Sequence, residues 1–274
     1  MKLKLAIGAA MAGAFSLGAL IVAYSSARQD EAVQTEASRH ISTSFSQLEE
    51  DEIRQIVRQY IMDNPDILIQ SINEYGQRRK EREIAYAKEA APNILPALLD
   101  PATSFVAGKN PDKAKVAVVE LFDYHCSVCK RATPQIQQML ARDPAVKFIF
   151  RELPTLSEES DFAAQASLAA KEQGKFLDFH FAMMEASGML KKERIFEIAK
   201  QQGLDTAKLG EDAESEPVIA AITQNHAMMA EMNLRGTPTF VIATLDGSFI
   251  DVMNGYHESI LKDKIDAAKK AAKK

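Results

Sequence analysis

The sequence predicts an α/β fold in which a helical block interrupts a mixed sheet. Four segments have the apolar composition and the flanking turn signals of strands: 115–123, 146–151, 239–243 and 248–253. The first is a continuous apolar run, typical of a strand buried on both faces. A helical pattern follows it to about residue 141. Asp246 and Gly247 form the predicted turn between the last two strands.

A helix-rich stretch at about 157–233 separates the second strand from the third. It contains four predicted helices: 161–173, 175–186, 191–202 and 216–232. A final helix is predicted at 258–273. Because strand, helix and strand precede this stretch, and two strands and a helix follow it, the block is predicted to be an insertion within one domain over 101–274.

The first residues have the order of a secretory signal. Lys2 and Lys4 precede an apolar stretch at 5–24, and the small residues 25–27 suit cleavage. We therefore expect a signal peptide at 1–27 and a location in an oxidising compartment. A retained anchor is the alternative, since about 20 apolar residues can span a bilayer. Removing 1–27 would change the net charge from −5 to −7, because this segment carries two lysines and no acid. That balance argues against nucleic-acid binding.

Residues 28–45 are polar and are predicted to be a linker, and residues 46–100 are predicted to be a helical segment. Ser46 and Glu49 have the spacing of a capping box. Asn64 and Pro65 are predicted to end the first helix and begin the second, with Asn64 as its N-cap. The prolines between residues 92 and 115 predict a connector rather than a helix.

Both predicted helices carry apolar residues at helical spacing, here called the apolar stripe: Ile53, Ile56, Val57, Tyr60, Ile61, Leu68, Ile72 and Tyr75. Two helices with so few large side chains cannot bury this stripe by themselves. They could fold back on the main domain. Self-association into a dimer or trimer is favoured, because the segment precedes a complete domain rather than interrupting one.

Cys126 and Cys129 are the only cysteines of the chain and lie where the first strand meets the following helix. A Cys-x-x-Cys pair at such a junction is typical of a thioredoxin-type redox site. The helix N-terminus favours the thiolate of Cys126, and the thiolate is the reactive form. A chain of this length can bury a core without a disulfide, so the pair is better explained by chemistry than by structural cross-linking.

Two further features fit the same kind of site. Thr237 and Pro238 directly precede the third strand, and X-Pro bonds are where cis peptides occur. Glu120 is the only acid within the apolar run of the first strand. A carboxyl buried there would have a raised pKa and could exchange protons with a nearby thiol. An exposed edge position is the alternative for Glu120.

Four stretches together resemble the DsbA-type thiol–disulfide oxidoreductases, and most closely their ScsC-like branch: 119–130, 151–154, 162–181 and 235–240. The resemblance implies a thioredoxin fold with an inserted helical domain, preceded by an N-terminal oligomerisation segment. It further implies that Cys126 is the exposed nucleophile and Cys129 the buried resolving thiol. Pro238 corresponds to the cis-proline of the family, and Glu120 to its buried glutamate.

The departures from the family pattern concern residues beside the thiols. Ser127 and Val128 replace the Pro-His pair of the strongly oxidising members, so we expect a less oxidising couple. His125 could partly compensate by stabilising the thiolate of Cys126, or it could be an exposed residue at a strand end. Thr237 before Pro238 resembles the isomerase and ScsC-like members.

The predicted function is a periplasmic disulfide isomerase and/or oxidase that needs no cofactor. Its expected partners are unfolded or misfolded secreted proteins, a membrane redox protein of the DsbB or DsbD/ScsB type, and further copies of itself. A copper-binding or copper-tolerance role of the reduced pair is the alternative, since soft thiolates bind copper. A zinc site is disfavoured because it needs four ligands, and a purely structural disulfide is disfavoured because so short a loop stabilises little.

Overall fold

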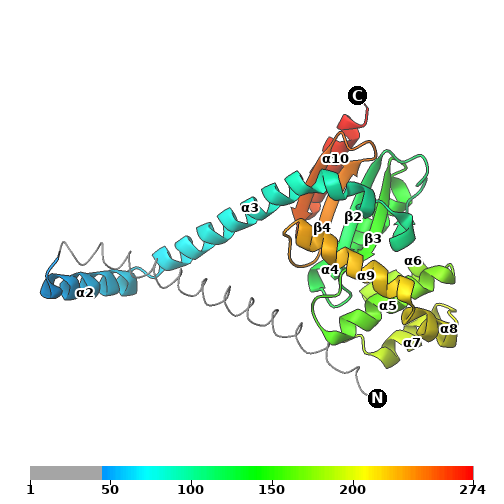
Figure 1. The fold of residues 1–274 in the computed structure, drawn as a ribbon, viewed down its shortest axis with the longest axis horizontal. Coiled ribbons are helices and arrows are strands. Elements are labelled where there is room, and N and C mark those ends of the chain that lie inside the picture. Colours follow the sequence, from blue (N-terminus) through cyan, green and yellow to red (C-terminus); the bar gives the residue numbers. More distant parts are fainter. Residues whose placement is uncertain (1–44, 274) are drawn as a thin grey trace, which may run out of the picture. The chain divides into compact units, whose positions relative to one another are not determined.

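The computed structural model describes residues 45–273 (Figure 1). The chain divides into two compact units between Tyr75 and Gly76. The predicted signal segment 1–27 and nearly all of the predicted linker 28–45 lie outside the described residues. No helix within residues 45–273 is both long and apolar enough to cross a membrane.

The first unit contains α2 (Gln47–Asp63) and the beginning of α3 (Asp66–Leu98). The predicted capping box is present: Ser46 N–H donates to Glu49 Oε2 at 2.8 Å, and Glu49 N–H donates to Ser46 Oγ at 3.4 Å. Asn64 differs from the prediction. It caps the C-terminus of α2, where its N–H and its side-chain amide both donate to the carbonyl of Tyr60, because its own backbone has left the helical region.

The apolar stripe lies on these two helices, and none of its members is buried within the described chain. Ile56 is 67 % exposed and Ile72 is 68 % exposed. Burial of each such side chain would contribute about 1.5–3 kcal/mol. The stripe is therefore a surface without an apolar partner among the described residues of this one chain.

The second unit begins inside α3, and the helical structure of residues 92–98 is a correction to the predicted connector. The helix continues to Leu98, with Pro92 and Pro96 inside it. A proline removes one helical hydrogen bond and crowds the preceding turn. Burial of one helix face offsets this cost, through five buried residues: Ala87, Ala91, Ile94, Leu95 and Leu98.

A five-stranded sheet forms the centre of this unit, in the order β1-β3-β2-β4-β5. Its strands are β1 (Phe105–Ala107), β2 (Val116–Phe122), β3 (Val146–Glu152), β4 (Thr239–Thr244) and β5 (Ile250–Asn254). β2 is parallel to β3 and antiparallel to β4, while β1 and β5 pair antiparallel at the two edges. The four predicted strands are confirmed. The three-residue β1 was not predicted, because it is too short for a periodic signal.

Helices cover both faces of the sheet (Figure 1). Alternate β2 residues point to opposite sides, so Val116, Val118 and Phe122 pack with α4 (Ser127–Arg142) and α10 (Glu258–Ala271). Ala117, Val119 and Leu121 pack with α3 and α9 (Glu216–Glu231) on the other side. Both faces of β2 are thus covered, which explains its unbroken apolar composition.

The insertion between β3 and β4 contains five helices: α5 (Glu158–Glu172), α6 (Phe176–Glu185), α7 (Lys192–Gln201), α8 (Thr206–Ala213) and α9. The short α8 was not predicted. Its start is marked by Asp205, whose carboxylate accepts hydrogen bonds from the N–H groups of Ala207 and Lys208. The insertion is also the source of several buried methionines that fill the core: Met183, Met184, Met228, Met229 and Met232.

Arg151 joins α3, β3 and α9. Its guanidinium is fully buried and donates to the carbonyl oxygens of Ala97 and Leu98, at the end of α3, and to Asn225 Oδ1 at 2.8 Å on α9. Burial lowers the pKa of Arg151 to about 10. The last carbonyls of a helix have no partner within the helix, so Arg151 satisfies them and attaches α3 to the sheet.

Candidate active site

The two thiols lie at the start of α4. Cys126 is the N-cap of this helix, and Cys129, in its first turn, donates its N–H to Cys126 Sγ at 3.4 Å. Both cysteines are free thiols. Cys126 keeps 6 % of its surface exposed, whereas Cys129 is fully buried. Both thiols are therefore buried, so the exposed position that the resemblance implies for Cys126 is not found, although Cys126 is the less buried of the two.

The two thiols have opposite acidities. Hydrogen bonding from the Cys129 side chain lowers the pKa of Cys126 to about 5, assisted by the Thr237 side chain and by the N–H groups of Cys129 and Val128. Burial raises the pKa of Cys129 far above its usual range, as does its hydrogen bond to Cys126. At neutral pH Cys126 is therefore a thiolate and Cys129 a thiol.

The loop before β4 completes the site. Cys126 Sγ is 3.2 Å from the carbonyl oxygen of Thr237, and the Thr237–Pro238 peptide is cis, as the family resemblance implies. Gly255 N–H donates to the Pro238 carbonyl at 2.8 Å and ties this loop to the end of β5. Thr237 Oγ1 is buried and has no oxygen or nitrogen hydrogen-bond partner among the described residues, and it helps to lower the pKa of Cys126. This hydroxyl therefore remains available to the sulfur beside it.

Glu120 lies on β2, on the face shared with Val118 and Phe122, and is 1 % exposed. Burial raises its pKa to about 8, with a smaller contribution from the charge of Cys126. The charge of Glu120 in turn raises the pKa of Cys129. The buried position expected from the sequence is confirmed, and the carboxyl is electrostatically coupled to both thiols.

His125 does not have the exposed position that was one of its two expected environments. Its Nδ1 is 2.9 Å from Ser160 Oγ on α5, and its Nε2 accepts the N–H of Leu190 at 3.0 Å. Because Nε2 accepts, the ring proton of neutral His125 lies on Nδ1 and points to Ser160. Both ring nitrogens are thus engaged away from Cys126, so His125 connects the active-site loop to the insertion.

Asp123 is a site residue that sequence reasoning missed. Its carboxylate is buried and accepts four hydrogen bonds, from His125 N–H at 2.7 Å, Thr155 N–H at 2.8 Å, Leu156 N–H at 3.1 Å and Ser160 Oγ at 2.9 Å. It therefore holds the active-site loop, the loop after β3 and α5 together. The sequence signal that could have identified Asp123 is the Asx-turn pattern, in which an aspartate accepts a hydrogen bond from the backbone N–H two residues later.

Two more residues beside the thiols contact the insertion. The Tyr124 hydroxyl is 2.9 Å from His180 Nδ1 on α6, and burial lowers the pKa of His180 to about 3. Lys130 Nζ donates to the carbonyls of Met183 and Ala186 at the end of α6. The inserted helices therefore support the Cys-x-x-Cys loop.

A second buried carboxyl lies on β3. Glu152 Oε1 accepts the Ser167 hydroxyl at 2.7 Å, and Oε2 has no partner among the described residues. Burial raises the pKa of Glu152 to about 7. No group of three or more His, Cys, Asp or Glu side chains suited to a metal ion occurs within residues 45–273.

Comparisons with known proteins agree with this geometry. Residues 102–258 match the family described as "Thioredoxin", which is more than half of the chain. Residues 49–82 match the family described as "Copper resistance protein ScsC N-terminal domain".

Solved structures extend the likeness. A thioredoxin-like oxidoreductase from Silicibacter pomeroyi is 41 % identical, with a TM-score of 0.58, and the alignment covers 63 % of this chain and 95 % of that one. BcfH of Salmonella enterica Typhimurium is 27 % identical, with a TM-score of 0.59 and coverages of 81 % and 96 %. The catalytic domain of Proteus mirabilis ScsC is 25 % identical, with a TM-score of 0.58 and coverages of 68 % and 99 %.

Curated relatives include Na(+)/H(+) antiporters named NhaA. One from Salinispora tropica is 28 % identical over 166 residues, and one from Herminiimonas arsenicoxydans is 30 % identical over 155 residues. These alignments cover 60 % and 55 % of this chain but 25 % and 24 % of the antiporters. The chain thus spans about a quarter of the length of the curated relatives it matches.

Proposed function

The chain belongs to the thioredoxin family, in its DsbA-type, ScsC-like branch, and from this premise we propose that it is a periplasmic thiol–disulfide oxidoreductase acting on secreted proteins. One observation carries the proposal. The less buried thiol, with a pKa of about 5, lies next to a fully buried thiol of raised pKa and 3.2 Å from the Thr237 carbonyl. This arrangement provides one attacking sulfur, one resolving sulfur and a backbone edge for a client.

As an oxidant, the protein begins with a Cys126–Cys129 disulfide. A client thiolate attacks Cys126 Sγ, forms a mixed disulfide and displaces the sulfur of Cys129. A second client thiolate then attacks the client sulfur, which forms the client disulfide and releases Cys126 as a thiolate. Two electrons pass from the client to the protein. The low pKa of Cys126 favours this second step, because a stable thiolate is a good leaving group.

As an isomerase, the protein begins reduced. The Cys126 thiolate attacks a wrong client disulfide, and the freed client thiolate attacks another client disulfide until Cys126 is released. If rearrangement stalls, Cys129 attacks Cys126 and releases a reduced client. Glu120 would take the proton of Cys129 in that step and return it when Cys129 is displaced, since its raised pKa suits a proton shared with a thiol.

Client binding and self-association complete the proposal. The backbone of a client would pair with the loop at Thr237 and Pro238, as an added strand does. The exposed apolar stripe supports a dimer or trimer, which would place several thiol sites around one large client. A membrane redox protein of the DsbB or DsbD/ScsB type would set whether the pair is kept oxidised or reduced.

The test combines activity with the redox state in the cell. Purified protein should oxidise dithiols in its disulfide form and should recover activity of a scrambled multi-disulfide protein in its reduced form, and Cys126→Ser should do neither. Thiol trapping in cells separates the two roles: a mostly oxidised pair means oxidase, and a mostly reduced pair means isomerase. Absence of both activities in the wild-type protein would refute the proposal.

Copper binding by the reduced pair remains the second candidate. It is supported by two adjacent soft thiols and by the copper resistance named in the description of the family that matches residues 49–82. Competition with a Cu(I) chelator tests it. Cys126→Ser and Cys129→Ser should each abolish binding, whereas copper retained by the double variant would place the metal elsewhere.

A further inference from the structure

Two neighbouring hollows meet beside the loop that precedes Pro238. The first, of about 500 Å³, lies between α9, the loop after β3 and the loop before β4, and its lining includes His226, Leu156 and Arg235. The second, of about 520 Å³, lies between α3 and the end of β5 and shares Asn233 and Arg235 with the first. A client that leaves the thiol site on this side would therefore meet a continuous hollowed surface.

This surface is positively charged on a protein whose net charge is −5. Arg79, Lys80 and Arg235 line the second hollow together with one acid, Glu83, which lies 3.3 Å from Arg79 Nε. Neither Lys80 nor Arg235 forms an ion pair with any described residue. The lining of the first hollow contains His226 and Arg235 and no acid. Unpaired cations in a concave surface attract anionic ligands.

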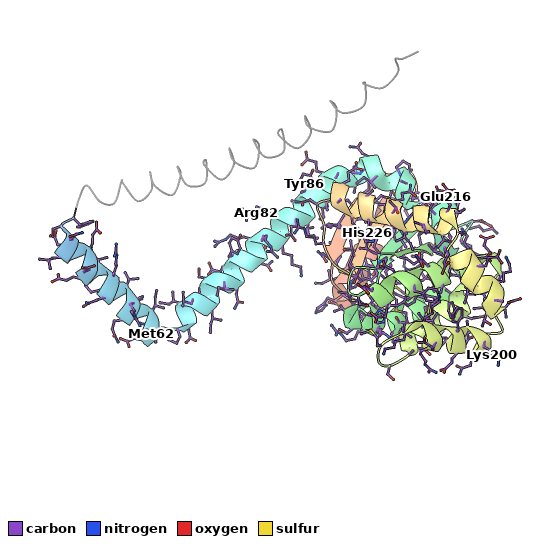
Figure 2. The ribbon with its side chains drawn as sticks, turned by 60° about the horizontal axis from the view of Figure 1, so that its bottom comes forward. Met62, Arg82, Tyr86, Lys200, Glu216 and His226 are labelled. Atoms are coloured by element: carbon purple, nitrogen blue, oxygen red, sulfur yellow. The ribbon has the colours of Figure 1, made fainter. Side chains whose placement is uncertain are left out.

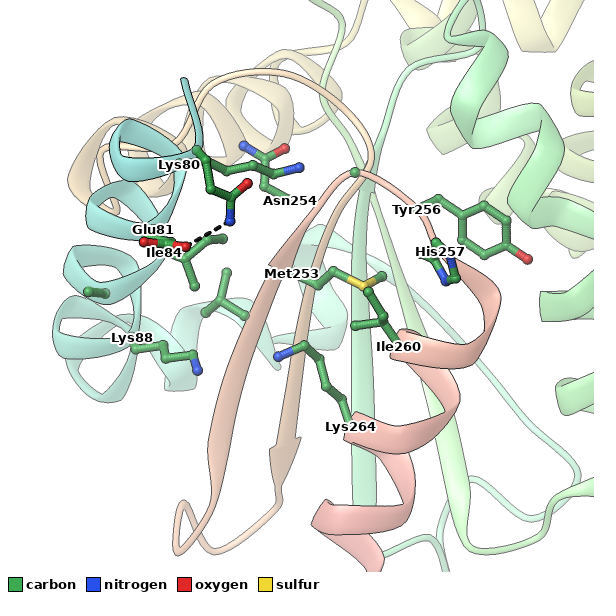
Figure 3. Close-up of a pocket in the computed structure, with 14 residues that line it drawn as sticks. Lys80, Glu81, Ile84, Lys88, Met253, Asn254, Tyr256, His257, Ile260 and Lys264 are labelled. Atoms are coloured by element: carbon green, nitrogen blue, oxygen red, sulfur yellow. Dashed lines mark hydrogen bonds between the residues drawn. The ribbon is translucent and has the colours of Figure 1, made fainter. Parts of the chain in front are cut away.

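The neighbouring groove, of about 650 Å³, differs in how its charged side chains are paired (Figure 3). There Lys88 and Lys264 each lie 2.6 Å from Asp251 and share this one carboxylate. The Glu81 carboxylate accepts a hydrogen bond from the Gln77 side-chain amide at 2.8 Å, which is the dashed line of Figure 3. Lys80, which lines both this groove and the second hollow, has no such partner. Of the three lysines that line this groove, the one without an acidic partner is therefore the one shared with the second hollow.

The charged surface also lies within reach of the reacting sulfur. Arg235 precedes Thr237 by two residues, and the Thr237 carbonyl is 3.2 Å from Cys126 Sγ. Two extended residues span at most about 7 Å. A client with its cysteine at Cys126 and its backbone along this loop would therefore place its next few residues over Arg235. The same region offers apolar contact through Leu156, which is 55 % exposed.

We propose that Arg235 and Lys80, with His226 beside them, form a cationic docking surface for an extended acidic segment of the client, located within a few residues of the client's reacting cysteine. The inference rests on the proposed function and adds a class of client to it. The three side chains are solvent-exposed, so their effect is to accelerate association and to select among clients, and salt weakens it.

The experiment uses three dithiol peptides with one cysteine-containing core and acidic, neutral or basic flanks. Each rate of oxidation by the full mature protein is divided by the rate at which a small disulfide oxidises the same peptide, which removes differences in peptide thiol acidity. At low ionic strength kcat/KM for the acidic peptide should exceed that for the basic peptide about tenfold or more. In 1 M salt, where the screening length is about 3 Å, the ratio should approach one.

Charge reversal locates the effect. Arg235→Glu and Lys80→Glu should each reduce the acidic-to-basic ratio, and the double variant should invert it. Both rates in the ratio are measured on the same variant, so a change in the intrinsic reactivity of its thiol affects both rates equally and cancels. Lys200→Glu is the matched control: it makes the same charge change on α7, away from His226 (Figure 2) and outside the lining of both hollows, and should leave the ratio unchanged.

The outcomes separate this inference from the proposed function. Equal rates for the three peptides, with turnover of all of them, would overturn the docking surface and leave the oxidoreductase intact. No turnover of any peptide or small dithiol would refute the oxidoreductase. In that case, fluorescence anisotropy with the acidic peptide carrying serine in place of cysteine tests the surface alone. Saturable binding that Arg235→Glu removes would support it, and absence of binding would overturn it.

Discussion

The sulfur of Cys126 lies 3.2 Å from the carbonyl oxygen of Thr237, although the two residues are 111 positions apart in the sequence. The contact joins the start of α4 to the loop before β4 across the whole helical insertion. Its consequence is chemical. It places the less buried of the two sulfurs beside the backbone to which, in the proposed function, a client would pair.

The thiol acidities predict selective alkylation. Cys126 should react with iodoacetamide at a rate that rises with pH around a midpoint near 5, because its pKa is lowered to about 5, whereas buried Cys129 should not react. Mass spectrometry of the alkylated protein identifies the modified residue. Cys126→Ser should abolish turnover and Cys129→Ser should accumulate mixed disulfides. A midpoint near 8.5, the value for a free thiol, would contradict the proposed nucleophile.

The same pKa predicts how stability depends on pH. The fold lowers the pKa of Cys126 to about 5, so between this value and that of a free thiol, about 8.5, the unfolded state binds the proton and the folded state does not. The free energy of unfolding of the reduced form should therefore rise from pH 5 to pH 9, and this contribution is lost as pH falls through 5.

Urea denaturation of the reduced and disulfide forms, compared at pH 5 and pH 8, measures this contribution. The disulfide form lacks the Cys126 thiol, so the difference between the two forms largely cancels the opposite effect of Glu120, whose raised pKa of about 8 makes folding less favourable as pH rises. Reduced Cys126→Ser, which lacks the ionisable thiol, is the control. The rise in the free energy of unfolding that Cys126 causes between pH 5 and pH 8 should be absent from it. A difference that is independent of pH would mean that Cys126 is not ionised in the fold.

Glu120→Gln should slow the steps that move the proton of Cys129. A positioned acid–base group contributes about 10²-fold or more, so resolution of a mixed disulfide by Cys129 should fall by that order and lose its pH transition near 8. Stopped-flow kinetics of a preformed mixed disulfide measures this step. The control is the alkylation rate of Cys126, which does not depend on the proton of Cys129. A changed alkylation rate would indicate that the substitution disturbs the whole site. An unchanged resolution rate would mean that water carries the proton.

Asp123 is predicted to be a structural requirement of the site. Asp123→Ala leaves three backbone N–H groups and the Ser160 hydroxyl without their acceptor, at about 1–3 kcal/mol for each group that stays buried. Asp123→Asn keeps one acceptor oxygen and should cost less. Urea denaturation of the disulfide forms ranks the two variants. Equal stability of Asp123→Ala and the wild-type protein would show that water replaces the carboxylate.

Truncation should separate assembly from chemistry. Removing residues 28–75 deletes the apolar stripe but retains the buried part of α3, so we expect a folded monomer that still oxidises small dithiols and loses most isomerase activity on a large client. Light scattering and circular dichroism measure mass and folding. A monomeric mass for the full mature protein at tens of micromolar would contradict assembly through the stripe.

The position of the cut is decided by the fold. Removing residues 28–100 would also delete Ile94, Leu95 and Leu98, each worth about 1.5–3 kcal/mol when buried. It would further remove the carbonyls that Arg151 bonds at the end of α3 and leave a buried cation short of acceptors. This variant should be unstable or insoluble, and a stability equal to that of the shorter deletion would show that α3 is dispensable to the sheet.

The sequence by itself determined four of the five strands, the redox pair and the class of fold, because these depend on local patterns. The apolar run of β2 must be buried on both faces, and a Cys-x-x-Cys at a strand–helix junction places one sulfur at a helix N-terminus whatever surrounds it. The burial of Glu120 followed from the same reasoning, since a central strand has no exposed face.

Only the tertiary structure decided where α3 ends, what His125 contacts and what Asp123 holds. Pro92 and Pro96 oppose a helix locally, and packing of the buried face of α3 on the sheet outweighs them. His125 and Asp123 meet Ser160 and Leu190, which come from a helical insertion far along the chain. Such contacts depend on the relative placement of distant segments, and periodicity within one segment carries no information about that placement.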